Sequence, residues 1–194
     1  MRKAKVYIAL LHHPMYNKRM DVITTSVTNL DLHDIARAAR TYEVENFFVV
    51  HPSPNQQKLI KDIVSYWQEG YGGDYNADRK EAFSILKVCS NLEQVIEHIV
   101  EQDGEKPLVV ATDARDYGIS VTYSSLKDAI HEEERSFLIL FGTGWGIDKE
   151  LIMNCDYLLE PVEPGRSYNH LSVRSAVAII LDRLLGAYWF SEEV

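Results

Sequence analysis

Short apolar runs alternate along this chain with segments whose apolar residues recur at helical spacing. Six runs have the length and composition of strands: Val6–Leu11, Asn46–His51, Ser84–Cys89, Pro107–Thr112, Ser136–Phe141 and Asp156–Glu160. Helical spacing predicts helices at Asp31–Tyr42, Pro54–Glu69, Leu92–Gln102, Ser124–Glu134, Asp148–Asn154 and Leu171–Ala187. Such alternation indicates βα crossovers, and several strands are apolar throughout, as parallel strands covered on both sides are. We therefore predict an α/β fold, a largely parallel sheet with helices on both faces.

Length and composition are typical of one soluble globular domain, which we predict over residues 1–194. The chain has 194 residues, of which 46% are hydrophobic. No apolar run approaches the ~18 residues needed to cross a bilayer, and no signal-peptide core follows the basic start. We expect a cytoplasmic protein that does not bind membranes. Cys89 and Cys155 lie in or beside apolar stretches, and we expect reduced, buried thiols without a chemical role.

The net charge of −9 argues against a protein that coats nucleic acid in general, because such a surface is normally basic. It leaves open an enzyme that engages one RNA site through a local basic patch. In parallel sheets, ligands bind beyond the carboxyl ends of the strands. That rule directs attention to four segments: Thr112–Arg115, Gly142–Gly146, Glu160–Gly165 and the loop entering the last helix.

The segment after the fifth strand carries glycine at three alternate positions, Gly142, Gly144 and Gly146, before a helix that Asp148 is placed to cap. Three interpretations compete. The loop could be a tight strand-to-helix turn. A dinucleotide site would need G-x-G-x-x-G after the first strand, whereas the third position here is Ile147. The remaining interpretation is a loop whose backbone wraps an adenosine-type ligand.

Two further segments carry polar residues at helix starts. A loop marked by proline and glycine leads from Glu160 to the run Tyr168–Ser172, which either caps the last helix or holds a small ligand. We do not expect a metal site there, since no second His or Cys stands at ligand spacing from His170. On the first predicted helix, His33, Arg37 and Arg40 share one face. That face is either solvated or presents Arg37 to a phosphate or ribose oxygen.

These three segments in this order, with the opening Leu11–Lys18, resemble the SPOUT methyltransferase superfamily, and within it a small bacterial branch of predicted RNA methyltransferases. The similarity spans nearly the whole chain. The family usually has asparagine near Asp31 and glycine near His33, and its ribose-methylating members carry glutamate where this chain has Trp145. These departures weaken any assignment of the ribose 2′-hydroxyl as the methyl acceptor.

The resemblance implies a C-terminal trefoil knot, a homodimer, S-adenosylmethionine (SAM) as cofactor, and direct methyl transfer to tRNA or rRNA rather than DNA. Arg37 would act across the dimer interface, with Asn17, Lys18 and Tyr168 near the transferred methyl. The implied cofactor-binding residues, acting largely through backbone groups, are Thr112, Phe141, Gly142, Thr143, Gly144, Trp145, Gly146, Glu160, Pro161, Val162, His170, Leu171, Ser172 and Val173.

An alternative hypothesis keeps the same pocket but no catalysis, as a regulatory module that senses SAM or another nucleotide.

Two other segments bear on the partners of the protein. Trp67–Lys80, rich in glycine and aromatic residues, is either a mobile flap on which a base stacks or an ordinary solvent loop. The aromatic end Tyr188–Phe190 would be an unusual exposed patch on a monomer, which favours a dimer.

Overall fold

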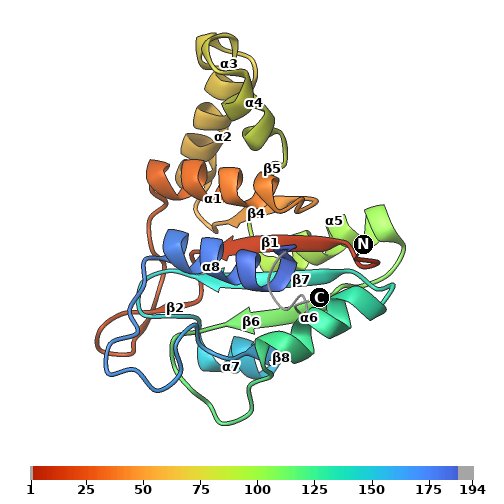
Figure 1. Ribbon diagram of the computed structural model, residues 1–194. Coiled ribbons are helices and arrows are strands. Elements are labelled where there is room, and N and C mark those ends of the chain that lie inside the picture. The colour runs from red at the N-terminus through yellow and green to blue at the C-terminus, as the bar shows by residue number, and fades with distance from the viewer. Residues whose placement is uncertain (1, 188–194) are drawn as a thin grey trace.

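The computed structural model describes residues 2–187, so the aromatic end Tyr188–Phe190 lies outside the described residues. Its centre is a six-stranded sheet in the order β5-β4-β1-β7-β6-β8, and every pairing in it is parallel (Figure 1). The strands are β1 (Val6–Leu11), β4 (Phe47–Val50), β5 (Leu86–Cys89), β6 (Leu108–Thr112), β7 (Phe137–Gly142) and β8 (Tyr157–Leu159). All six correspond to predicted runs, and the predicted parallel sheet is confirmed.

Helices cover both faces of the sheet, as predicted. One face packs against α1 (Asn29–Thr41), α6 (Tyr123–Glu132) and α8 (Val173–Leu185), which supply Ile35, Leu126 and Leu181 to a shared core. The other face packs against α5 (Leu92–Asp103) and α7 (Lys149–Met153). β1 shows why its sequence is apolar throughout: Val6, Ile8 and Leu10 enter the first core, whereas Tyr7, Ala9 and Leu11 enter the second.

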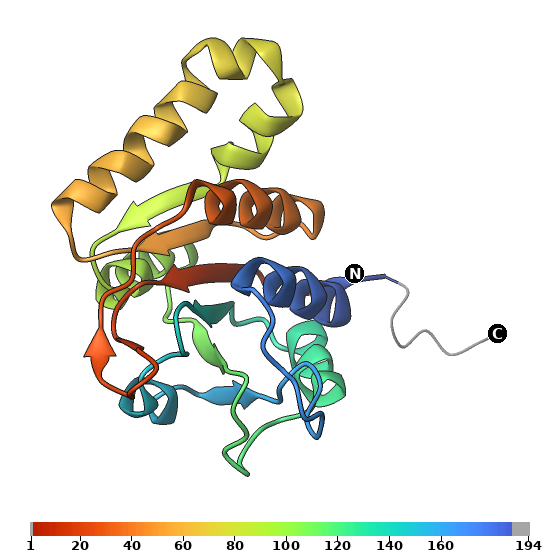
Figure 2. The ribbon, with the colours of Figure 1, turned by 90° about the vertical axis from the view of Figure 1, so that its left-hand side faces the viewer.

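The connection from β4 to β5 is a helical arm, formed by α2 (Pro54–Gln68), α3 (Tyr71–Tyr75) and α4 (Ala77–Ser84), that projects away from the sheet (Figures 1 and 2). The segment Trp67–Lys80 is therefore mostly helical, and our expectation of a flap or a solvent loop was wrong. A Cβ atom on Gly72 would lie 2.5 Å from the ring of Tyr66 and 2.8 Å from that of Trp67. Gly70, Gly72 and Gly73 all approach Tyr66 or Trp67 in this way, so these glycines permit close helix packing instead of marking a loop.

A small antiparallel hairpin, β2 (Met15–Tyr16) and β3 (Val22–Ile23), follows β1 and was not predicted. An isolated bridge pairs Met15 with Ile147, just beyond the glycine loop. The chain runs outward from β1 to β4 and β5, then crosses to β6 and returns to β7 beside β1. Parallel sheets bind ligands where the winding direction reverses in this way, outside the carboxyl ends of the strands.

Both cysteines are free, with Cys89 buried and Cys155 half-buried. Burial raises the pKa of Cys155 to about 11, so its thiol stays protonated at neutral pH. Within residues 2–187, no helix is long and apolar enough to span a bilayer. The same part of the chain contains no group of three or more His, Cys, Asp or Glu side chains that could hold a metal ion.

Candidate functional site

The loops that follow β6, β7 and β8 meet at the carboxyl edge of the sheet. Asn169, in the loop before α8, donates a hydrogen bond from Nδ2 to the carbonyl of Ala114 after β6, at 3.3 Å. In the same loop, the ring centroid of His170 lies 6.3 Å from that of Trp145 in the glycine loop. Three of the four segments singled out from the sequence, those after β6 and β7 and the loop entering the last helix, therefore lie together.

The glycine loop requires glycine because its backbone enters the left-handed region and lies against a polar pair. Gly144 and Gly146 have φ values of +61° and +101°. A Cβ atom on Gly146 would stand 2.8 Å from Arg115 Nη2 and from Asp113 Oδ2. The loop is thus folded tightly onto the residues that follow β6.

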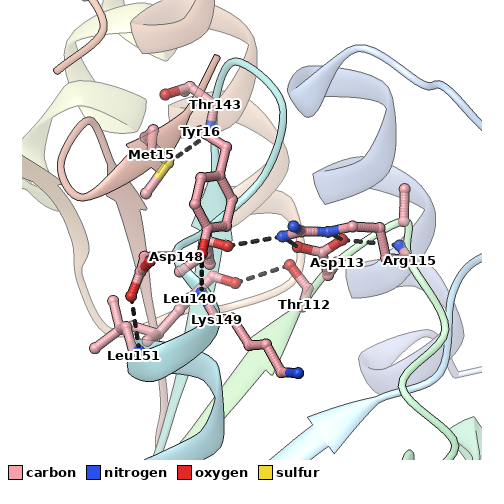
Figure 3. Close-up of polar contacts among 12 residues, drawn as sticks. Met15, Tyr16, Thr112, Asp113, Arg115, Leu140, Thr143, Asp148, Lys149 and Leu151 are labelled. Atoms are coloured by element: carbon pink, nitrogen blue, oxygen red, sulfur yellow. Dashed lines mark hydrogen bonds and ion pairs between the residues drawn. The ribbon is translucent and has the colours of Figure 1, made fainter. Parts of the chain in front are cut away.

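That polar pair is a forked ion pair, which we call the Asp113–Arg115 fork. Arg115 donates from Nε and Nη2 to the two carboxylate oxygens of Asp113, at 2.8 and 2.6 Å, and from Nη2 to the carbonyl of Ile147 at 2.7 Å (Figure 3). Its guanidinium also lies 5.1 Å from the ring centroid of Tyr16 and 5.5 Å from that of Tyr117. The fork therefore ties the β6 loop, the glycine loop and the hairpin together.

The hairpin braces the other side of the glycine loop. The amide of Thr143 donates to the sulfur of Met15 at 3.2 Å (Figure 3), the amide of Trp145 donates to the carbonyl of Tyr16 at 3.0 Å, and the amide of Tyr16 donates to the carbonyl of Gly146 at 2.9 Å. Asp148 caps α7 as predicted, accepting from the amides of Glu150 and Leu151. The five loop residues Gly142–Gly146 are therefore held by the hairpin on one side and by the Asp113–Arg115 fork on the other.

A network of histidine and threonine side chains connects the glycine loop to the ends of β1 and β4. The hydroxyls of Thr25 and Thr143 are 2.5 Å apart, and that of Thr143 donates to the carbonyl of Leu11. Thr25 Oγ1 is also 3.0 Å from His12 Nδ1, and the carbonyl of Thr25 is 2.9 Å from His51 Nε2. Because Ser53 donates its amide hydrogen to His51 Nδ1, His51 is neutral with its hydrogen on Nε2. The hydrogen bond from Ser53 therefore requires the imidazole of His51 to be uncharged.

Burial, with a smaller effect from His51, lowers the pKa of His12 to about 4. An unfolded chain binds this proton near pH 6.5, so between pH 6.5 and 4 the unfolded state takes up a proton that the folded state refuses. We predict that the unfolding free energy falls as the pH drops through this range, by roughly 3 kcal/mol at pH 4. Urea titrations at several pH values would measure this loss.

In a His12→Gln variant the unfolding free energy should fall less steeply with pH, whereas a variant of the exposed neighbour, His13→Gln, should follow the wild type. Equal slopes in all three proteins would contradict the assignment.

Several predicted cofactor residues have side chains already engaged by the protein. The hydroxyl of Thr112 donates to the carbonyl of Leu140, the carboxylate of Glu160 accepts from the amide of Tyr123, and the hydroxyl of Ser172 caps α8. Phe141 is buried in the core. At these four positions, backbone groups are therefore what remains for a ligand.

The predicted catalytic residues are not all near these loops. Tyr168 is 74% exposed and lies beside His170, with ring centroids 5.5 Å apart. The side chain of Asn17 closes the hairpin turn, accepting from the amides of Arg19 and Asp21. Arg37 is exposed on α1 and lines a hollow of about 380 Å³ together with arm residues. Within one chain, Arg37 does not join the loop cluster.

The two departures from the family's first motif have structural partners. Asp31 is buried and accepts from Thr28 at 2.6 Å and from Arg174 of α8 at 3.3 Å. His33 packs edge-on against Trp67 and Phe83 of the arm, with centroids 5.3 and 4.8 Å away. These two residues therefore attach α1 to the start of α8 and to the arm.

Another hollow lies away from the loops and is larger than the one beside Arg37. It measures about 880 Å³, opens at the amino-terminal ends of the strands, and includes Arg2, Lys5 and His131 in its lining. None of the predicted cofactor residues contributes to it. The candidate site is therefore defined by loop convergence, glycine geometry and backbone access.

A family model described as "SAM-dependent RNA methyltransferase" matches residues 5–186. The chain belongs to this family. SAM is therefore its cofactor. A protein of Aquifex aeolicus is 45% identical to this methyltransferase over 184 residues, which are 95% of this chain and 90% of that protein. A tRNA (guanine-N(1)-)-methyltransferase of Nitratidesulfovibrio vulgaris is 41% identical over 181 residues, 93% of this chain, but the match spans only 42% of that relative.

The fold of this methyltransferase is similar to that of solved methyltransferases of the SpoU type. The SpoU methyltransferase AviRb from Streptomyces viridochromogenes, solved in complex with AdoMet, superposes with a TM-score of 0.56 at 13% identity, covering 95% of this chain and 60% of AviRb. The chemistry of the candidate site also fits SAM, independently of the comparisons. The engaged side chains leave backbone groups to bind adenosine, and the exposed Trp145 and Leu171 offer apolar surface beside them.

Proposed function

We propose that this methyltransferase, a single domain over residues 1–194, transfers a methyl group from SAM to a nucleotide of tRNA or rRNA, in the cytoplasm and as a homodimer. The observation that carries the proposal is the convergence of the loops after β6, β7 and β8, braced by the hairpin and by the Asp113–Arg115 fork. The tRNA methyltransferase relative supports an RNA of this class.

We further propose that the C-terminal segment forms a trefoil knot. β8 is an edge strand, yet α8, which follows it, packs against α1, α6 and the central strand β7. The chain between them passes the loops after β6 and β7, where Asn169 contacts Ala114. This return from the sheet edge to its centre is the path that a knotted C-terminus requires.

When bound, SAM supplies an electrophilic methyl group on a sulfonium. The role of the protein is to orient the acceptor atom in line with that methyl and to hold or remove the acceptor's proton. Arg37 is the proposed positioning group for the acceptor phosphate or ribose, because guanidinium recognises both. Since Arg37 stands apart from the loops of its own chain, we propose that it serves the site of the partner protomer. The exposed Tyr168, with Asn17 and Lys18 of the hairpin turn, would lie near the methyl.

A second candidate function is a SAM-binding regulatory module without catalysis. The net charge of −9 and the departures at Asp31 and His33 favour it, because both weaken the expected RNA site. The two candidates predict the same cofactor binding and differ only in transfer.

Two measurements test the proposal. Calorimetry should show SAM and its demethylated product binding, and a Gly144→Arg variant should lose that binding, because the new side chain meets the carbonyl of Tyr16 and the methyl of Thr25. Incubation with labelled SAM and total RNA should then incorporate methyl groups into RNA. Binding without transfer to any RNA would select the regulatory module, and absence of binding would overturn both.

A further inference from the structure

Four exposed side chains gather where the glycine loop meets the segment before α8. We call Trp145, Tyr168, His170 and Leu171 the aromatic rim. Trp145 is 52% exposed, Tyr168 74% and Leu171 45%, and the ring centroid of His170 lies 6.3 Å from that of Trp145 and 5.5 Å from that of Tyr168. Large aromatic side chains this exposed, grouped beside a candidate site, mark an interaction surface.

The rim is fixed to the rigid part of the molecule at both ends. The amide of Trp145 donates to the carbonyl of Tyr16, and Asn169 donates to the carbonyl of Ala114. The loops that carry the rings are therefore anchored before any partner arrives, which lowers the backbone entropy lost on binding.

Positive charge lies in the hairpin turn, next to the residue that the amide of Trp145 contacts. Lys18 and Arg19 are exposed in the hairpin turn that directly follows Tyr16. The acidic residue of that turn, Asp21, accepts from the side chain of Asn17 at 3.0 Å. Aromatic rings beside free cations are the arrangement that binds single-stranded nucleic acid, with stacking on the bases and attraction of the phosphates.

We propose that the aromatic rim binds an unpaired nucleobase of the RNA substrate beside the methyl donor; this rests on the proposed function. The acceptor nucleotide is thereby held by its base. Base stacking on such rings tolerates sequence change, because every base has a π face.

The other exposed aromatic pair of the described chain suits RNA less well. Tyr71 and Tyr75 of the arm stack on each other, with centroids 6.2 Å apart, and lie next to Asp74 and Asp78. Neighbouring carboxylates repel phosphates, and each ring already covers one face of the other. This pair therefore serves as a matched control.

Fluorescence anisotropy without any cofactor tests the proposal. The probes are a labelled single-stranded RNA of about 12 nucleotides and an abasic ribose-phosphate strand of equal length. Wild-type protein should bind the RNA at least roughly tenfold more tightly than the abasic strand. Trp145→Ala and Tyr168→Ala should each weaken RNA binding roughly five- to hundredfold, whereas Trp145→Phe and Tyr168→Phe should keep most of the affinity. The double variant Tyr71→Ala/Tyr75→Ala should bind as the wild type does.

Three outcomes overturn the proposal: equal affinity for the abasic strand, alanine variants of the rim that bind RNA normally, or loss of binding in the arm variant alone. Failure of the proposed function is a separate result. A protein that binds bases through the rim but takes up no SAM would refute the methyltransferase assignment and keep the rim. A protein that transfers methyl groups with rim variants of unchanged RNA affinity would refute the rim alone.

Discussion

Replacing Arg115 with methionine is expected to lower the unfolding free energy by about 2–4 kcal/mol and to weaken SAM binding roughly tenfold or more. The side chain of Asp113 is 2% exposed, and that of Arg115 31%. Methionine would leave a buried carboxylate without its cation and release the carbonyl of Ile147. Because Arg115 is partly exposed, the expected loss of unfolding free energy is smaller than for a fully buried ion pair. Urea unfolding and calorimetry measure the two effects.

A double variant separates the lost pairing from the lost side chain. In Asp113→Asn/Arg115→Met no buried charge is stranded, so much of the stability should return. SAM affinity should stay low, because the tie to the glycine loop is still missing. Arg115→Lys is a milder control that keeps the charge but not the forked geometry. If Arg115→Met unfolds at the same urea concentration as the wild type, the fork does not hold the loop.

The sheet could be predicted from local sequence because burial on both faces leaves a direct mark. Val6–Leu11 is apolar at all six positions, and its predicted bounds agree with those of β1. The first helix of the arm, α2, was also predicted, but α3 and α4 could not be, because Gly70, Gly72 and Gly73 are typical of loops. These helices depend on tertiary packing, in which the rings of Tyr66 and Trp67 occupy the space that Cβ atoms would fill.

The candidate site was predictable as a set of loops but not as a set of contacts. The rule that parallel sheets bind ligands beyond the carboxyl ends of their strands, together with the glycine spacing, was enough to pick out these loops. The Asp113–Arg115 fork was missed, although an acidic and a basic residue two apart directly after β6 were a usable signal. The contact between Thr25 and Thr143 left no signal in the sequence, because it joins two residues that are 118 positions apart and meet only in the folded chain.

An Arg37→Ala variant is expected to lose methyl transfer roughly 100-fold or more while binding SAM as the wild type does. Arg37 is exposed on α1 and touches none of the cofactor loops of its own chain, so its removal disturbs neither the core nor those loops. Loss of a group that orients the acceptor affects the transfer step. Single-turnover transfer of labelled methyl, beside calorimetry, measures both quantities. Arg40→Ala is the matched control, because it removes a neighbouring arginine that pairs with Glu81 of the arm. Equal transfer by Arg37→Ala and the wild type would end any role for Arg37 in the reaction.

Whether Arg37 acts on its own chain or on the partner's can be decided by mixing two inactive proteins. A twofold dimer has two equivalent sites, each with one chain's loops and, by our proposal, the other chain's Arg37. In a heterodimer of Arg37→Ala and Gly144→Arg chains, the intact loops of the first meet the intact Arg37 of the second, which restores one site of two. Random exchange makes half of the dimers mixed, so activity should return to about one quarter of wild type. If Arg37 served its own chain, every site in the mixture would carry one of the two lesions, and the mixture would stay inactive. Recovery of activity would therefore establish both the dimer and the shared site.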